Sequence, residues 1–172
     1  MKNLRKKDTT AMDGSKQPPA VQHLTEIFET IEYPEAFRIT YMANAIVFPA
    51  YAAVKRDFGL VRAEYVLLAC LSHFDELTAQ DVARISRQPR NTISRAVHRM
   101  LEEGYLRRAP DPEDGRQARL RITDKGRDLH TKIAEMHQKR QNEVLGGLNE
   151  EERATLSALL QKAVLHAATL KD

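Results

Sequence analysis

The chain has 172 residues, which is enough for one domain of ordinary size or for one domain with an added assembly element. Its composition, 42% hydrophobic and 30% charged with only seven Gly and seven Pro residues, is that of a globular protein and excludes a fibrous chain. Frequent Ala, Leu, Glu, Arg and Lys residues favour a helical fold. The formal net charge of +3 is too small to indicate a partner by itself.

Cysteine content and hydropathy predict a cytoplasmic protein with no membrane association. Cys70 is the only cysteine, so an intramolecular disulfide is excluded, as is typical of a reducing compartment. No apolar segment follows the basic residues near the N-terminus, so we expect no secretory signal. The longest mostly apolar run, residues 42–54, is too short to span a bilayer.

The first 74 residues predict a polar tail followed by three helices. We expect a disordered tail over residues 1–19 and helices over 20–31, 34–58 and 62–74, where apolar residues recur at helical spacing. Pro34 fits the first turn of the second helix, and Gly59 fits a left-handed residue at its end. Pro49 lies inside that helix and is expected to bend it, because proline has no N–H and its ring crowds the preceding turn.

Two shorter helices follow. Thr78 is the expected N-cap of the first, with Asp81 as its reciprocal partner, and this helix should end near Ser86. After a polar turn, Pro89 is expected at the first position of a second helix that ends before Gly104.

The remaining elements are a hairpin and two helices. Strands are expected over 105–109 and 117–122, joined by turn-forming residues. Thr123 should cap a long helix that ends near Leu145, and Asn149 should cap a last helix that ends near Leu170. The order predicts a mainly α fold with a small β-hairpin wing, in which the two short helices and the hairpin form a winged helix-turn-helix.

Charge is concentrated on the second short helix and its flanks. Residues 84–108 contain seven basic and two acidic residues, a net charge of +5 that exceeds the charge of the whole chain. On a helical wheel, one side of this helix is apolar, with Ile93 and Val97 at its centre, and the other is polar. The polar side presents Asn91, Arg95 and His98, flanked by Thr92, Ser94 and Arg99, with Arg90 in the first turn.

Such a helix has two interpretations. It could be a solvated amphipathic helix whose arginines serve solubility. The scarcity of acidic residues and the hairpin that follows favour the alternative, a helix that enters the major groove of DNA, where Arg and Asn match guanine and adenine edges.

The motifs resemble those of the MarR family of transcription regulators. The resemblance covers roughly residues 35 to 170 and rests on residues 77–83, 91–97, 101–106, 111–116 and 120–126, of which the Asp-Gly-Arg wing before the Ile-Thr-x-x-Gly segment is the most specific. It implies that Arg116 enters the minor groove and that the Asp114 carboxylate orients it. It also implies major-groove contacts by the residues that match the family's positions: Arg90, Asn91, Thr92, Ser94 and Arg95. Gln88 and Pro89 depart from the family pattern, in which a small hydroxyl residue is common.

The resemblance further implies a homodimer built from the N- and C-terminal helices. The sequence supports this, because the last helix carries a broad apolar face with Leu156, Leu160 and Val164 that would be exposed to solvent in a single chain. Folding back of this helix within one chain is the alternative. The expected organisation is a tail (1–19), N-terminal dimerisation helices (20–60), the DNA-binding domain (61–122) and C-terminal dimerisation helices (123–172).

The cysteine, the histidines and the aromatic residues do not indicate a further site. Cys70 lies in an apolar segment without an adjacent base and is expected to be a small core residue rather than a redox sensor. The six histidines form no pair with metal-site spacing, so we expect no metal and no cofactor. A group of aromatic residues could line an effector cavity or belong to the core: Tyr41, Phe48, Tyr51, Tyr65 and Phe74.

The sequence thus predicts a DNA-binding transcription regulator and not an enzyme. From the resemblance we expect repression of a pseudo-palindromic operator, relieved by a small molecule, often an aromatic anion, whose site the sequence does not locate. The alternative is a protein-interaction adaptor that uses a winged-helix fold without specific DNA binding.

Overall fold

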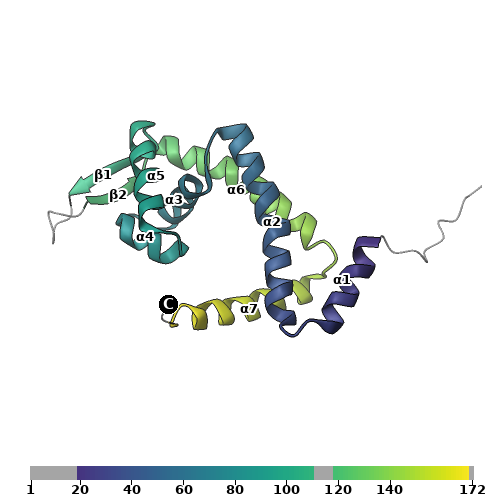
Figure 1. The fold of residues 1–172 in the computed structure, drawn as a ribbon. Coiled ribbons are helices and arrows are strands. Elements are labelled where there is room, and N and C mark those ends of the chain that lie inside the picture. The colour runs from purple at the N-terminus through teal and green to yellow at the C-terminus, as the bar shows by residue number, and fades with distance from the viewer. Residues whose placement is uncertain (1–18, 111–117, 171–172) are drawn as a thin grey trace, which may run out of the picture. The chain divides into compact units, whose positions relative to one another are not determined.

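The computed structural model describes residues 19–110 and 118–170, and the predicted mainly α fold with a two-stranded hairpin is confirmed. Figure 1 shows the elements along the chain. They are, in chain order, α1 (Pro19–Thr30), α2 (Pro34–Phe58), α3 (Arg62–His73), α4 (Ala79–Ser86), α5 (Arg90–Glu102), β1 (Leu106–Pro110), β2 (Ala118–Ile122), α6 (Asp124–Val144) and α7 (Glu150–Ala167). None of these helices combines the length and the apolar character needed to cross a membrane. The predicted disordered tail lies almost wholly outside the described residues.

The chain divides into two compact units, residues 1–43 and 44–172. In the first unit, the rings of Phe28 and Phe37 meet edge to face with their centroids 6.0 Å apart, and the guanidinium of Arg38 lies 5.1 Å from the Phe28 ring centroid. These contacts join α1 to the start of α2. Most other apolar side chains of this unit remain exposed, among them Tyr33 and Ile39.

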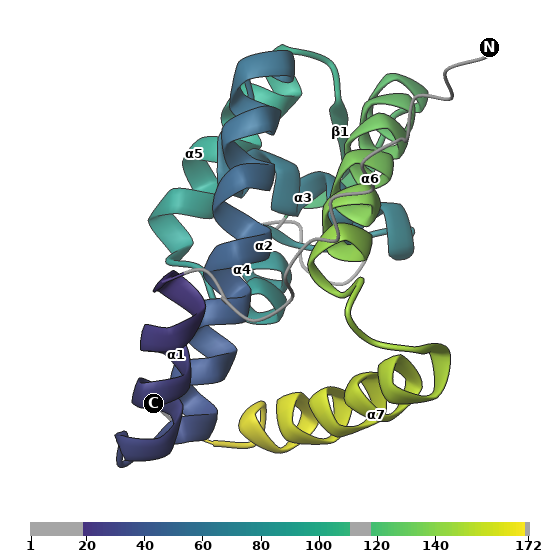
Figure 2. The ribbon, with the colours of Figure 1, turned by 90° about the vertical axis from the view of Figure 1, so that its right-hand side faces the viewer.

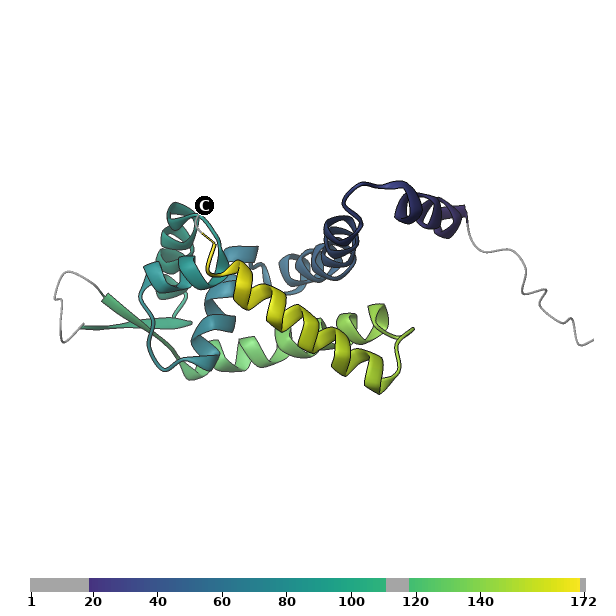
Figure 3. The same cartoon turned by 90° about the horizontal axis from the view of Figure 1, so that it is seen from below.

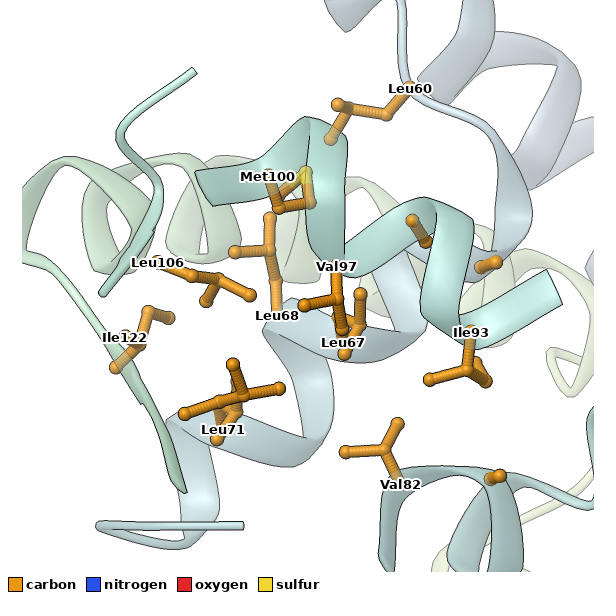
Figure 4. Packing of buried hydrophobic residues seen from close by; sticks show 14 of the residues in the cluster. Leu60, Leu67, Leu68, Leu71, Val82, Ile93, Val97, Met100, Leu106 and Ile122 are labelled. Atoms are coloured by element: carbon orange, nitrogen blue, oxygen red, sulfur yellow. The ribbon is translucent and has the colours of Figure 1, made fainter. Parts of the chain in front are cut away.

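The core of the second unit is organised around α3. This helix lies between α5 and α6 (Figure 2). Its Leu67, Leu68 and Leu71 side chains are fully buried and, as Figure 4 shows, face α5 on one side and the hairpin residues Leu106 and Ile122 on the other. Burying such side chains stabilises the fold by about 1.5–3 kcal/mol each, so α3 is the element that fixes α5 and the hairpin in place.

The helix α2 continues through Pro49. Proline offers no N–H, so the carbonyl of Ala45, four residues earlier, has no partner within the helix. Arg140 of α6 satisfies this carbonyl, with its Nε at 3.0 Å and its Nη2 at 2.8 Å from the oxygen. The fork of Arg140 therefore joins α6 to α2 at the position that proline leaves open. The bend expected at Pro49 stays a prediction.

The boundaries of the helix-turn-helix follow its capping residues. Thr78 accepts a hydrogen bond from the N–H of Asp81 at 3.1 Å, and the Asp81 carboxylate accepts one from the N–H of Thr78, so the predicted capping box is confirmed. The hydrogen bonds from Thr78 hold the pKa of Asp81 below its ordinary value. Gly59 ends α2 with a φ of +67°, as predicted. The prediction for Pro89 was wrong by one position: it is the N-cap of α5, and Arg90 is the first helical residue.

The hairpin packs closely against the start of α6. Its two strands are antiparallel, with Leu106 opposite Ile122. Thr123 caps α6 by accepting a hydrogen bond from the N–H of Gly126 at 3.2 Å, as predicted. A side chain on Gly126 would overlap the carbonyl oxygen of Tyr105, so this position requires glycine.

The last helix, α7, is held mainly at its beginning. Asn149 and Glu152 form the predicted capping box, and Arg153 donates to the carbonyl of Leu145 at 3.0 Å. No residue of α7 is buried. Folding back therefore does not cover its apolar face, on which Leu159, Leu160 and Val164 remain exposed.

Candidate nucleic-acid interface

The polar side of α5 is the candidate site, and the core determines which side is polar. Ile93, Ala96, Val97 and Met100 are buried against α3 and α4. Because these four fix the rotation of the helix, the opposite side faces outward. It presents the predicted residues as one surface, with Arg90, Asn91, Ser94, Arg95 and His98 exposed and Thr92 half-buried.

Arg90 and Arg95 carry uncompensated positive charge on this surface. In the described parts of the chain, no carboxylate lies within ion-pair distance of either guanidinium. Among the described residues, the hydrogen bond of the Arg95 guanidinium is to the carbonyl of Asn91 on the same helix, with its Nε at 3.4 Å from the oxygen. Neutralisation by the protein's own carboxylates, which would remove the case for DNA, is therefore not seen at these two residues.

Arg99 differs from Arg95 although it lies one turn away. Its Nη1 lies 2.9 and 3.0 Å from the two carboxylate oxygens of Glu64, whose side chain is only 4% exposed, and its Nη2 donates to the carbonyl of Gly59 at 3.1 Å. Glu64 also accepts a hydrogen bond from the N–H of Val61 at 2.8 Å. Arg99 thus belongs to the junction of α2, α3 and α5, and sequence reasoning, which placed it beside the polar face, missed its partner.

The start of α5 offers backbone donors beside these side chains. Its N-cap is Pro89, which makes no side-chain capping hydrogen bond; the N–H of Thr92 donates to the Pro89 carbonyl at 3.0 Å, so the N–H groups of Arg90 and Asn91 keep their capacity for an external acceptor. Helix N-termini of this kind suit phosphate oxygens.

A hollow of about 220 Å³ lies between the outward face of α5, the start of α4 and the hairpin. Thr78, Gln80, Ser94, His98 and Arg108 contribute hydroxyl, amide and basic groups to its walls. Three elements therefore present hydrogen-bonding side chains toward the same space.

The described part of the hairpin is basic, and two of its arginines have a protein partner. Arg119 and Arg121 both pair with Glu76, which precedes α4; the Nε of Arg119 lies 3.8 Å from a carboxylate oxygen. Both arginines are half-buried and pair with the same carboxylate. The predicted wing pair, Asp114 and Arg116, lies outside the described residues.

Aromatic residues of the second unit form a cluster around His137. The His137 ring stacks on Tyr65 with centroids 4.5 Å apart, and it meets the edge of Tyr51 at 5.9 Å. Burial lowers the pKa of His137 and raises that of Tyr65, so both are neutral at pH 7. Phe48 and Phe74 are exposed and do not join this cluster.

Cys70 and the histidines show no sign of a reactive or metal site. Burial raises the pKa of the Cys70 thiol, which keeps it protonated at neutral pH and disfavours thiolate chemistry. Within residues 19–110 and 118–170, no three His, Cys, Asp or Glu side chains lie together in a way that could hold a metal ion.

Known proteins resemble this chain over the same region. A family model described as the MarR family matches residues 58–117. The transcriptional repressor IacR of Pseudomonas putida is 30% identical over 99 residues, which are 58% of this chain and 56% of IacR, so the chain spans about half the length of that relative.

Two solved structures share the fold. The MarR-family regulator of Silicibacter pomeroyi is 24% identical, with a TM-score of 0.69 over 86% of this chain and 98% of that one. BpsR of Bordetella bronchiseptica, whose DNA binding is regulated by 6-hydroxynicotinic acid, is 22% identical, with a TM-score of 0.60 over 74% of this chain and 98% of BpsR.

Proposed function

We propose that this chain, whose winged helix-turn-helix region is similar to the MarR family, is a sequence-specific DNA-binding regulator of transcription that acts in the cytoplasm as a homodimer and has no catalytic role. The observation that carries the proposal is the outward face of α5, where Arg90 and Arg95 stand unpaired by any described carboxylate on a helix whose other side is fixed in the core.

The proposed contacts follow from the chemistry of each side chain. Arg90, Asn91 and Arg95 reach base edges in the major groove, because their forked donors and acceptors match guanine and adenine. Thr92 and Ser94 bind phosphate, together with the first N–H groups of α5. His98 faces the same groove one turn further along the helix.

The wing adds a second contact in this proposal. Arg116 enters the adjacent minor groove, with Asp114 as the carboxylate that orients it. This step rests on the family motif at these two positions, and on the basic strands that lead into and out of the wing.

The dimer is proposed from apolar surface that the chain itself leaves uncovered. On α1 and α2 this surface includes Ile27 and Ile39, and on α7 it includes Leu159, Leu160 and Leu165. Exposed apolar faces on helices at both ends of the chain are typical of an assembly surface. A twofold dimer would place two α5 helices on half-sites about one helical turn apart.

We further propose that the protein is a repressor and that a small molecule, an aromatic anion, releases it from DNA. The repressor IacR and the ligand-regulated BpsR support this proposal by their similarity to this chain. The physical requirement is that the ligand binds the DNA-free arrangement more tightly than the DNA-bound one, because only a difference in affinity shifts the equilibrium.

A gel-shift experiment with fragments of the source genome tests the function. We expect retention of a small set of fragments in the presence of excess nonspecific duplex, with an affinity that falls steeply between about 50 and 200 mM salt, since phosphate contacts release counterions. Binding to no fragment would favour the protein-interaction adaptor, and a flat salt response would contradict docking on phosphates.

A further inference from the structure

The hollow of about 220 Å³ between α5 and the hairpin contains an arginine that none of the proposed DNA contacts uses, Arg108. Figures 1 and 3 show the hairpin beside α4 and α5, which form the other walls of this hollow. Its lining residues belong to α4, α5 and the two strands, except Thr78, which immediately precedes α4. The hollow is therefore built from elements other than α1, α2 and α7, to which the proposed dimer surface is assigned.

The hollow has an apolar inner wall and a polar rim. Val97 and Leu120 form the inner wall and are buried, at 6% and 2% exposure. The rim consists of exposed side chains that can donate hydrogen bonds: Gln80, Ser94, His98 and Arg108. A sugar–phosphate unit of DNA has the same division, because apolar deoxyribose carbons lie beside a charged phosphate. The chemistry of the walls thus matches a piece of nucleic-acid backbone.

The rim keeps its positive charge and its donors. Within residues 19–110 and 118–170, the side chains of Ser94, His98 and Arg108 have no ion-pair or hydrogen-bond partner. The carboxylate of Asp81, in the first turn of α4, accepts hydrogen bonds from the N–H and the hydroxyl of Thr78 at 3.1 and 2.7 Å and does not line the hollow. An anion that enters the hollow therefore meets unoccupied donors and a guanidinium.

The register of the hairpin places Arg108 at the hollow and Arg107 on the other face. Successive side chains of a strand point to opposite faces of the sheet. Arg108 is opposite Leu120, and both line the hollow, whereas Arg107 is opposite Arg121, and neither of them lines it. Arg107 and Arg108 are both exposed. Two neighbouring arginines of equal charge thus face different surfaces.

The proposed docking brings a DNA strand to this hollow. In the proposed complex, α5 enters the major groove and the hairpin meets the adjacent minor groove, and one sugar–phosphate strand separates these two grooves. The hollow lies between the same two protein elements. At about 30 Å³ for each water molecule, it holds several waters and has room for one phosphate group that displaces them.

We propose that the hollow binds a phosphodiester of the strand between the two grooves, with Arg108 as the charged ligand and with Gln80, Ser94 and His98 as hydrogen-bond donors. This site depends on the proposed DNA-binding function and adds a contact to it. Contacts with phosphate position a protein on the duplex but carry no sequence information. Arg108 therefore contributes affinity for every duplex, whereas Arg95 discriminates between sequences.

Replacement of Arg108 tests the site, and Arg107→Ala is the matched control. Arg108→Ala should weaken binding about tenfold to the operator and to a scrambled duplex alike, because one charged hydrogen bond to phosphate is lost. The slope of log affinity against log salt should fall in magnitude by about 0.9, the contribution of one phosphate. Arg107→Ala removes the same charge and should change affinity less than about twofold, with the slope unaltered.

Gln80→Glu gives a second reading without removing an arginine. It adds a carboxylate to the rim, which should weaken binding to both duplexes by repelling phosphate. Gln80 lies in the first turn of α4, where a negative charge favours the helix, so the urea midpoint should not fall. A loss of affinity at an undiminished urea midpoint therefore reports on the site and not on the fold.

Ethylation interference on the operator locates the contact at single phosphates. In the native protein, ethylation of a phosphate between the protected major groove and the adjacent minor groove should block binding. Arg108→Ala should lose the interference at this phosphate, while the phosphates that contact the start of α5 keep theirs. Interference that is the same in the two proteins would overturn the site.

The outcomes separate the two proposals. If the native chain binds no duplex, the regulator function and the phosphate site are both overturned. If it binds its operator but Arg108→Ala acts like Arg107→Ala, only the phosphate site is overturned. The site is also overturned if Arg108→Ala weakens binding to the operator and not to the scrambled duplex, because Arg108 then reads a base.

Discussion

Arg95 and Arg99 lie one turn apart on α5, and the structure predicts that their loss has separable effects. Arg99→Ala should destabilise the fold, because Arg99 pairs with the buried carboxylate of Glu64. Arg95→Ala should weaken DNA binding and leave the fold intact, because Arg95 is exposed and its guanidinium donates to a carbonyl of its own helix.

The size of the Arg99 effect follows from burial of its partner. Removing one member of a fully buried ion pair costs about 3–5 kcal/mol, since the other charge loses its partner without regaining water. Here the Arg99 side chain is 45% exposed, so water can replace some of the hydrogen bonds that the guanidinium donates. Glu64 also retains the hydrogen bond that it accepts from the N–H of Val61. We therefore expect Arg99→Ala to lower the free energy of unfolding by about 2–3 kcal/mol.

For Arg95→Ala the expected loss lies in binding. A bidentate contact with a base contributes about 1–3 kcal/mol of discrimination, so operator affinity should fall about 5- to 150-fold while affinity for a scrambled duplex falls less. Its free energy of unfolding should change by less than about 0.5 kcal/mol. Urea unfolding followed by circular dichroism and anisotropy titration of labelled duplexes measure the two quantities.

The double variant Arg99→Ala, Glu64→Leu is the control for the buried charge. It should recover part of the stability lost in Arg99→Ala, because no carboxylate is then left buried without its cation. Equal losses of stability in Arg99→Ala and in Arg95→Ala would refute this reasoning. So would a larger loss of operator affinity in folded Arg99→Ala than in Arg95→Ala.

Three further predictions concern the fold. Gly126→Ala should lower the free energy of unfolding by more than about 2 kcal/mol because its Cβ overlaps a backbone carbonyl, whereas Gly147→Ala, with nothing within 4 Å, should leave the urea midpoint nearly unchanged; equal midpoints would contradict this. Burial lowers the pKa of His137, so on acidification the imidazole binds a proton in the unfolded chain before it does so in the folded one. The free energy of unfolding should therefore fall as the pH drops below the ordinary value of 6.5. His137→Phe should flatten that dependence, and an unaltered pH profile would exclude His137 as its source. Arg140→Ala should cost about 1–2 kcal/mol in urea unfolding because it leaves the Ala45 carbonyl unsatisfied, and a cost no greater than that of an exposed substitution would show that water replaces the guanidinium.

Local signals were sufficient to predict most element boundaries. The pairs Thr78 with Asp81 and Asn149 with Glu152 start α4 and α7 where the capping pattern places them, and Gly59 ends α2. Such signals act over three or four residues, so a single sequence contains all the information needed to place these helix ends. The polar face of α5 was predictable for the same reason, because helical spacing alone separates it from the buried face.

Contacts between distant segments were not predictable in this way. Arg99 and Glu64 are 35 residues apart, and nothing near either residue indicates the other. The fork of Arg140 on the Ala45 carbonyl had one available signal, since Pro49 identifies which carbonyl loses its partner. Which side chain would satisfy it depends on how α6 packs on α2, and that is a property of the fold.

A footprint of the full-length protein on a genomic fragment that it retains tests the central claim most directly. Chemical protection read at each base should show two half-sites related by a twofold axis, centred about 10–10.5 base pairs apart, with major-groove protection that Arg95→Ala reduces in both. Protection that is absent, confined to one unpaired half-site, or unchanged by Arg95→Ala would contradict the assignment of α5 as the helix that reads DNA.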